Sequence, residues 1–271
     1  MTMQGAGHYG GLSEAEIRDF TEVGWITVRG LFTAREVARM QDCFDRLEAI
    51  AELMAGTGMH DGSYFVLGGK QGDKVIERVV WAGASQRYLL AISSDPRLTV
   101  PCAQLLKSNA MDQLLNQAHF KRPRDGVVFD WHQDIEHRDK GNGTWTDVNG
   151  CGSFVQTVIV LDEMTPDSGP MLFVPGSSTW GRVDCANLID GKSDRAPNEH
   201  ARLPEAPETI HASPGDTLFF GPYTVHGSFE NRSGRPRRVL INGYASPGAN
   251  HRSYPGDGAG RRLTAPAAPR G

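Results

Sequence analysis

The residues best suited to chemistry lie in the segment Trp131-His132-Gln133-Asp134. Side chains alternate along an extended strand, so His132 and Asp134 would point to the same face. An imidazole and a carboxylate placed side by side can bind one metal ion. Such a pair also arises on an ordinary surface, in a chain with nine histidines. The pair therefore indicates a metal site only with support from elsewhere in the sequence.

A third ligand candidate is His226, which follows the apolar run at residues 217–220. Two histidines and one carboxylate form the facial triad of non-haem Fe(II) oxygenases, which leaves coordination positions open. Eleven residues further on, Arg237 precedes an apolar strand and could hold a carboxylate through two parallel hydrogen bonds. A solvated charge is the alternative for this arginine, since it belongs to a cluster with Arg232, Arg235 and Arg238.

Helices are expected in the first part of the chain. Capping boxes, in which a Ser or Thr precedes a Glu by three residues, begin at Ser13 and Thr33. After Thr33, apolar residues recur at helical intervals to about Met54, and Asp95-Pro96 predicts the start of a third helix. A short strand is expected at residues 25–28.

From residue 110 the pattern changes to short β-rich runs separated by Gly, Pro and Asp, which predicts an antiparallel sandwich or barrel. The runs are residues 114–120, 127–131, 154–161, 171–174, 217–220 and 239–244. We expect one domain over residues 1–255, with a helical part at about 12–108 and a β core at about 110–246. The Gly- and Pro-rich residues 256–271 are expected to form a disordered tail. Long loops, suited to lids, are expected at residues 56–73, 136–152 and 183–207.

Composition narrows the class of protein. The chain has 271 residues, 39% of them hydrophobic, and a net charge of −4, which fits a globular protein and argues against nucleic acid as a partner. No apolar run is long enough to span a membrane. The cysteines are isolated, which argues against disulfides and zinc thiolates and favours a cytoplasmic location: Cys43, Cys102, Cys151 and Cys185. A small-molecule substrate and a monomer or homodimer are expected.

Four motifs in order resemble the phytanoyl-CoA dioxygenase superfamily of Fe(II)/2-oxoglutarate oxygenases. They are LSEAEIRDFTEVGWITVRGLFTAREVARM, WHQD, LDEMTPDSGPMLFVPGSS and VHGSFENRSGRPRR. The SGPMLFVPGSS stretch is nearest to the ectoine-hydroxylase-like branch. Two departures are Ser178, which stands where relatives have histidine, and residues 135–143, which lack that enzyme's signature and argue against ectoine as the substrate.

The resemblance implies a mainly β fold, a double-stranded β-helix (a jelly-roll, cupin-like core) with flanking helices. It implies that His132, Asp134 and His226 bind Fe(II). Arg237 would bind the distal carboxylate of 2-oxoglutarate with help from Ser228. His119 and Thr157 are further candidate contacts to 2-oxoglutarate, with a cross-strand polar role as the alternative for His119. Candidate substrate neighbours, for which packing is an alternative, are Gln113, Gln117, Trp145 and Gln156.

The implied activity is a dioxygenase that uses O2 and 2-oxoglutarate to oxidise an unactivated C–H bond, most simply by hydroxylation, and gives succinate and CO2. The substrate would be a small polar metabolite or a natural-product intermediate of secondary metabolism, such as antibiotic biosynthesis. Related halogenases have a small residue in place of Asp134, so halogenation is not expected.

Two alternatives stay open: a catalytically silent β-helix binding protein, and a metal-dependent hydrolase or isomerase on the same barrel. Acidic residues of the expected loops would suit a cationic or polyhydroxylated substrate, unless they are simply solvated: Asp61, Asp73, Glu136, Asp139 and Asp147.

Overall fold

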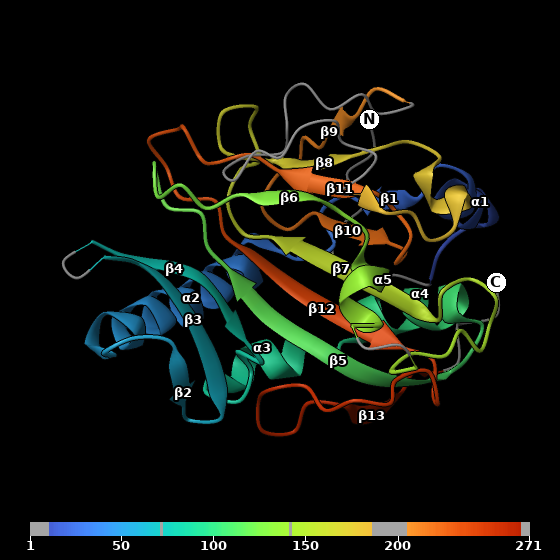
Figure 1. The fold of residues 1–271 in the computed structure, drawn as a ribbon, viewed down its shortest axis with the longest axis horizontal. Helices are drawn as coiled ribbons and strands as arrows, with labels where there is room; N and C mark the ends of the chain where they lie inside the picture. Colours follow the sequence, from blue (N-terminus) through green and yellow to red (C-terminus); the bar gives the residue numbers. More distant parts are fainter. Residues whose placement is uncertain (1–10, 71–72, 141–142, 186–204, 267–271) are drawn as a thin grey trace.

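Two antiparallel sheets form a jelly-roll core (Figure 1). The computed structural model describes residues 11–70, 73–140, 143–185 and 205–266. Within these ranges the larger sheet has the strand order β1-β10-β7-β12-β5-β4-β3-β2, with β13 also paired to β5, and the smaller sheet has the order β6-β11-β8-β9. Every pairing between these strands is antiparallel.

The helices and strands follow one another in this order: α1 (Glu14–Glu22), β1 (Trp25–Val28), α2 (Ala34–Leu53), β2 (Gly58–His60), β3 (Ser63–Lys70), β4 (Asp73–Val80), α3 (Arg87–Ile92), α4 (Pro96–Leu106), β5 (Ala110–His119), β6 (Phe129–His132), α5 (Asp134–Arg138), β7 (Phe154–Val160), β8 (Met171–Phe173), the 3-10 helix η1 (Ser177–Trp180), β9 (Glu208–Thr209), β10 (Thr217–Phe220), β11 (His226–Ser228), β12 (Val239–Ala245) and β13 (Arg261–Thr264).

The predicted helix starts are confirmed. In α1 the Ser13 hydroxyl accepts from the Glu16 amide and the Glu16 carboxylate accepts from the Ser13 amide, and Thr33 and Glu36 repeat this exchange in α2. Asp95 caps α4, whose first residue is Pro96. Each cap satisfies amide groups that the first helical turn leaves unpaired.

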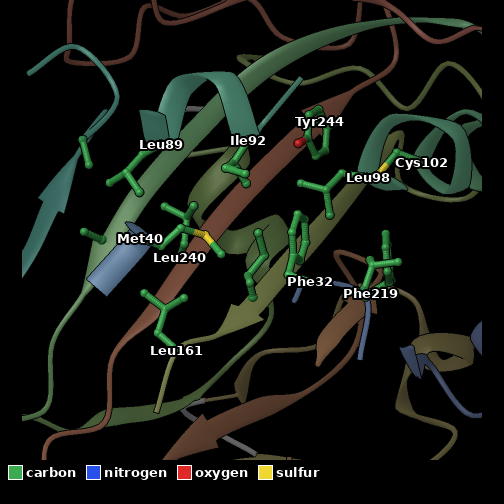
Figure 2. Packing of buried hydrophobic residues seen from close by; sticks show 14 of the residues in the cluster. Phe32, Met40, Leu89, Ile92, Leu98, Cys102, Leu161, Phe219, Leu240 and Tyr244 are labelled. Atoms are coloured by element: carbon green, nitrogen blue, oxygen red, sulfur yellow. The ribbon is translucent and has the colours of Figure 1, made fainter. Parts of the chain in front are cut away.

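The two faces of the larger sheet bury different clusters. Helices α2, α3 and α4 cover one face, where Met40, Leu89 and Ile92 pack with Leu240 and Tyr244 (Figure 2). The opposite face meets the smaller sheet through a second cluster that includes Trp25, Val158, Phe173, Phe220 and Ile241. Alternation along β7 and β12 therefore decides whether a side chain contacts the helices or lies between the sheets.

The predicted β core is confirmed, but the expected loop at residues 56–73 and the expected disordered tail need correction. Residues 56–73 are not a long loop, because β2 and β3 lie there and pair with each other. β3 also pairs with β4 in a hairpin that buries Phe65, Ile76 and Val79. The glycines of this stretch hid the alternating pattern. Most of the expected loop at 183–207 lies outside the described residues. Residues 136–152 begin in α5 and continue as irregular chain in their described part.

The prediction of a disordered tail is wrong for Arg261–Thr264, because these residues form β13 and pair with β5. Arg261 anchors it with hydrogen bonds to Gln113 Oε1 at 2.8 Å, to the Leu90 carbonyl oxygen at 3.0 Å and to Ser94 Oγ at 2.6 Å. These contacts outweigh a composition that by itself favours disorder.

The four cysteines are free in the structure. None of the helices in the described ranges is both long enough and apolar enough to cross a membrane.

Candidate active site

Three predicted ligands meet between neighbouring strands of the smaller sheet. His132 ends β6, Asp134 begins α5, and His226 begins β11 and pairs in register with His132. One ligand atom from each lies within 4.8 Å of the other two, and the imidazole centroids are 4.1 Å apart. The structure thus brings two imidazoles and a carboxylate to one point, as the sequence predicts.

Backbone contacts fix the tautomer of both histidines. His132 Nδ1 lies 2.7 Å from the carbonyl oxygen of Asp130, and His226 Nδ1 lies 2.9 Å from that of Thr224. Because a carbonyl oxygen only accepts, each Nδ1 must carry the proton. The lone pair of each Nε2 is then free to bind a metal, and the backbone contact orients the ring.

The charge states also suit a metal. Burial and the neighbouring His132 ring lower the pKa of His226 to about 3, although Asp134 acts in the opposite direction. Burial would raise the pKa of Asp134, but His226 and Arg138 outweigh it, so that the pKa is lowered. Asp134 is buried, and its Oδ2 has no hydrogen-bond partner. An unpaired buried carboxylate oxygen beside two imidazole rings fits a divalent cation.

A buried cationic group, Arg237, lines the same cavity as the three candidate metal ligands. Arg237 is 3% exposed, and its Nε and Nη2 donate to the Gly169 carbonyl oxygen at 3.1 and 2.5 Å. Burial lowers its pKa to about 10, which still leaves it charged near neutral pH. Beside it, Lys121 Nζ donates to Ser228 Oγ at 2.7 Å and to the Phe229 carbonyl oxygen. Burial and Arg237 hold the pKa of Lys121 far below its ordinary value.

Neither Arg237 nor Lys121 has a carboxylate counterion. Among the described residues no carboxylate comes within ion-pairing distance of Arg237 or Lys121. Asp125 acts on both at longer range, but its oxygens accept from the backbone amides of Arg122 and Val127. A buried guanidinium without a counterion is suited to a carboxylate of a ligand.

A cavity of about 500 Å³ connects these groups. His132, Asp134, His226, Ser228 and Arg237 all line it. Its apolar walls come from both sheets and include Leu115, Phe129, Met171, Val239 and Ile241. The metal ligands and the unpaired arginine therefore share one enclosure.

Three further predicted residues also line the cavity: Gln117, His119 and Gln156. The His119 ring nitrogen Nε2 lies 2.9 Å from Gln117 Oε1. Burial, together with Arg78 and Arg237, holds the pKa of His119 well below its ordinary value, so the ring is neutral. Gln156 is 5% exposed, and its Oε1 has no hydrogen-bond partner, which makes it an available acceptor.

The other three predicted residues do not line the cavity, and their expected roles are corrected. Thr157 pairs with Asn242 and Phe219 on the helix-covered face of the larger sheet. Gln113 accepts from Ser93 and Arg261 on that same face. Trp145 is a packing residue, whose ring meets Phe154 edge-on and whose Nε1 donates to the Gly152 carbonyl oxygen at 3.0 Å.

Several cavity residues escaped the sequence interpretation. Arg138, one helical turn after Asp134, could have been found from its spacing in α5. His137 packs 5.3 Å from the His132 ring. Arg252 and Tyr254 also line the cavity, but they come from a segment with no local signal. Four of the acidic residues that were expected to face a cationic substrate do not line the cavity: Asp61, Glu136, Asp139 and Asp147. The side chain of the fifth, Asp73, is not described.

Comparison with known proteins now bears on this geometry. The family model described as "Phytanoyl-CoA dioxygenase (PhyH)" matches residues 20–239. The chain belongs to the phytanoyl-CoA dioxygenase family. The match includes the two histidines, the aspartate and Arg237, and it agrees with the resemblance seen in the motifs.

This chain shares modest sequence identity with its relatives. It is 26% identical over 241 residues to the probable alpha-ketoglutarate-dependent hypophosphite dioxygenase of Stutzerimonas stutzeri, which covers 86% of this chain and 78% of that protein. It is 27% identical over 170 residues to the L-proline trans-4-hydroxylase of Streptomyces griseoviridis, which covers 52% and 61%. EctD from S. alaskensis, solved with 2-oxoglutarate and 5-hydroxyectoine, superposes with a TM-score of 0.67 at 21% identity, over 95% of this chain and 86% of that one.

Proposed function

We propose that this protein is an Fe(II)- and 2-oxoglutarate-dependent dioxygenase that hydroxylates a small polar metabolite or natural-product intermediate. One observation carries the proposal. Two imidazole nitrogens and a carboxylate converge in the cavity that also holds a buried arginine without a counterion. The first feature suits a ferrous ion, and the second suits the distal carboxylate of 2-oxoglutarate.

In this proposal each residue has a defined task. His132, Asp134 and His226 would hold the iron, and a set of three protein ligands leaves coordination positions for 2-oxoglutarate and O2. Iron bound there would supply the oxidation of an unactivated C–H bond by O2, in which one oxygen atom goes to the substrate and the other to the succinate that forms, with CO2, from 2-oxoglutarate.

The remaining groups hold the co-substrate. Arg237 binds its distal carboxylate, and the Ser228 hydroxyl, oriented by Lys121, adds a hydrogen bond. We assign His119 a neutral, polar contact beside it. The apolar walls of the cavity limit the access of water to the reacting centre.

Supporting evidence comes from the relatives. Those named above are described as a dioxygenase for hypophosphite and a hydroxylase for L-proline, and both names denote small polar substrates. The carboxylate of Asp134 favours hydroxylation over halogenation, because it fills the position that halide would need.

The test is anaerobic titration with Fe(II) and 2-oxoglutarate, monitored by visible absorption. We expect a weak charge-transfer band that His132→Ala abolishes, while His251→Ala, which changes a histidine outside the cavity lining, retains it. Absence of the band in the unaltered protein would contradict the proposal.

The two alternatives give other results. A catalytically silent binding protein would bind ligands but release no succinate with any substrate tested. A hydrolase or isomerase would convert its substrate in the absence of O2.

A further inference from the structure

We propose that the primary substrate carries an anionic group, a carboxylate or a phosphoryl group, and that Arg138 and Arg252 bind this group within the cavity. This inference rests on the proposed function, because it takes the metal ligands and Arg237 as assigned to iron and 2-oxoglutarate. It goes further in naming the chemical class of the molecule that is oxidised.

The cavity lining carries an excess of positive charge. Its cationic side chains are Arg78, Arg138, Lys140, Arg237 and Arg252, whereas Asp134 is its only carboxylate among the described residues. Arg78 is already paired with Glu77 at 3.7 Å. With Asp134 given to the metal and Arg237 to the co-substrate, Arg138, Lys140 and Arg252 remain without an ion-pair partner among the described residues. A cationic substrate would meet like charges here, and an anionic one would meet opposite charges.

Two of these cations form a built site. Arg138 and Arg252 both lie against the Tyr254 ring, with guanidinium carbons 5.3 and 4.4 Å from its centroid. Arg138 Nη1 donates to Tyr254 Oη at 2.9 Å, and Arg252 Nη2 donates to the His137 carbonyl oxygen at 2.6 Å. The guanidinium groups are therefore positioned by neutral acceptors.

Part of the hydrogen-bonding capacity of these two arginines is unused. Arg138 is 5% exposed, and the Nε atoms of Arg138 and Arg252 are both buried without an acceptor. Neither side chain has an ion-pair partner in the part of the chain that the structure describes. Leaving buried donors and charges unpaired is unfavourable, and an anion in contact with these guanidinium groups would satisfy them.

The position of Arg138 also limits the size of the substrate. Asp134 and Arg138 begin and end α5 and are four residues apart, so their backbones are separated by about 6 Å along the helix. Side chains at this spacing lie on the same helix face. An anion held by Arg138 is thus close to the metal position, and we expect oxidation at a carbon near the anionic group, not at the end of a long chain.

The test uses four probes of matched length: butanoate, propylphosphonate, butylammonium and butan-1-ol. Each is titrated anaerobically into protein loaded with Ni(II) and 2-oxoglutarate, and binding is measured by saturation-transfer NMR and calorimetry. The bound 2-oxoglutarate keeps the probes from Arg237. We expect at least one of the two anions to bind tenfold or more tightly than butylammonium and butan-1-ol. The anion that binds more tightly shows whether the site prefers a carboxylate or a phosphoryl group.

Variants tie the selectivity to the two arginines. We expect Arg252→Gln and Arg138→Gln each to weaken binding of the preferred anion about tenfold, with the Ni(II) and 2-oxoglutarate affinities retained. Arg232→Gln, which removes an exposed arginine paired with Glu230 outside the lining, should leave it unchanged. Arg252 is only partly buried, so its variant is expected to fold even if the Arg138 variant does not.

Each other outcome overturns a distinct claim. Equal binding of all four probes, or equal losses in the Arg232 and Arg252 variants, would refute the anion site and leave the proposed function intact. Failure of the unaltered protein to bind Ni(II) and 2-oxoglutarate would refute both.

Discussion

Replacement of Arg237 by glutamine should weaken the binding of 2-oxoglutarate and leave metal binding unchanged. Arg237 is 3% exposed, so water screens its charge little, and no carboxylate among the described residues pairs with it. Removing one partner of a buried, hydrogen-bonded charge pair costs about 2–5 kcal/mol. At about 1.4 kcal/mol per factor of ten, the dissociation constant should rise at least about 30-fold.

Calorimetric titration of 2-oxoglutarate into the Ni(II)-loaded protein measures this effect. The matched control is Arg238→Gln, which removes the next arginine along the chain. Arg238 pairs with Asp162 at 2.8 Å and Asp45 at 2.6 Å, and it does not line the cavity. A dissociation constant within threefold of the unaltered value in Arg237→Gln, or the same loss in both variants, would refute the role of Arg237.

Three further predictions concern stability. The Arg97 guanidinium lowers the pKa of Glu36 from 4.5 to about 2. The ionised Glu36 carboxylate therefore contributes its full stabilisation of the folded protein above about pH 4.5, and this contribution is lost as the pH falls towards 2. Glu36→Gln should therefore lower the free energy of unfolding by about 1 kcal/mol at pH 7, and urea titrations should show this difference shrinking below pH 4.5; a constant difference would contradict the assignment. Thr157→Val removes a buried hydroxyl without a partner, so the free energy of unfolding should stay within about 0.5 kcal/mol or rise, and 2-oxoglutarate affinity should not change; weaker affinity would restore the original role of Thr157. Gly243→Ala places a Cβ atom 2.5 Å from Phe154 Cζ and should cost about 1–3 kcal/mol in thermal or urea unfolding, so an unchanged midpoint would show that Phe154 moves freely.

Local signals in the sequence were sufficient for the helix starts and most strands. The capping boxes at Ser13 and Thr33 act within three residues, so no tertiary knowledge is needed to find them. The metal ligands required more. The spacing of His132 and Asp134 suggested a pair, but His226 joins them through strand pairing, and the family resemblance supplied that link.

The errors have physical causes in strand register. Alternation puts Gln113 on the same face as Gln117, but a register shift between Gly243 and Tyr244 of the paired strand places Leu115 and Gln113 on opposite faces. Thr157 differs from the cavity residue Gln156 by one position, which is enough to move it to the helix-covered face. For Arg252, only tertiary contacts with Tyr254 and His137 place it in the cavity, so no local pattern could predict it.

The central claim is that one ferrous ion binds between two imidazoles and one carboxylate, facing a 2-oxoglutarate held by Arg237. The most direct measurement is anomalous diffraction at the iron edge from crystals grown anaerobically with Fe(II) and 2-oxoglutarate. We predict a single strong peak about 2.1 Å from a nitrogen of His132 and of His226 and from an oxygen of Asp134, with the distal carboxylate of 2-oxoglutarate on the Arg237 guanidinium. A peak at other residues, no peak, or a 2-oxoglutarate bound away from Arg237 would contradict this account.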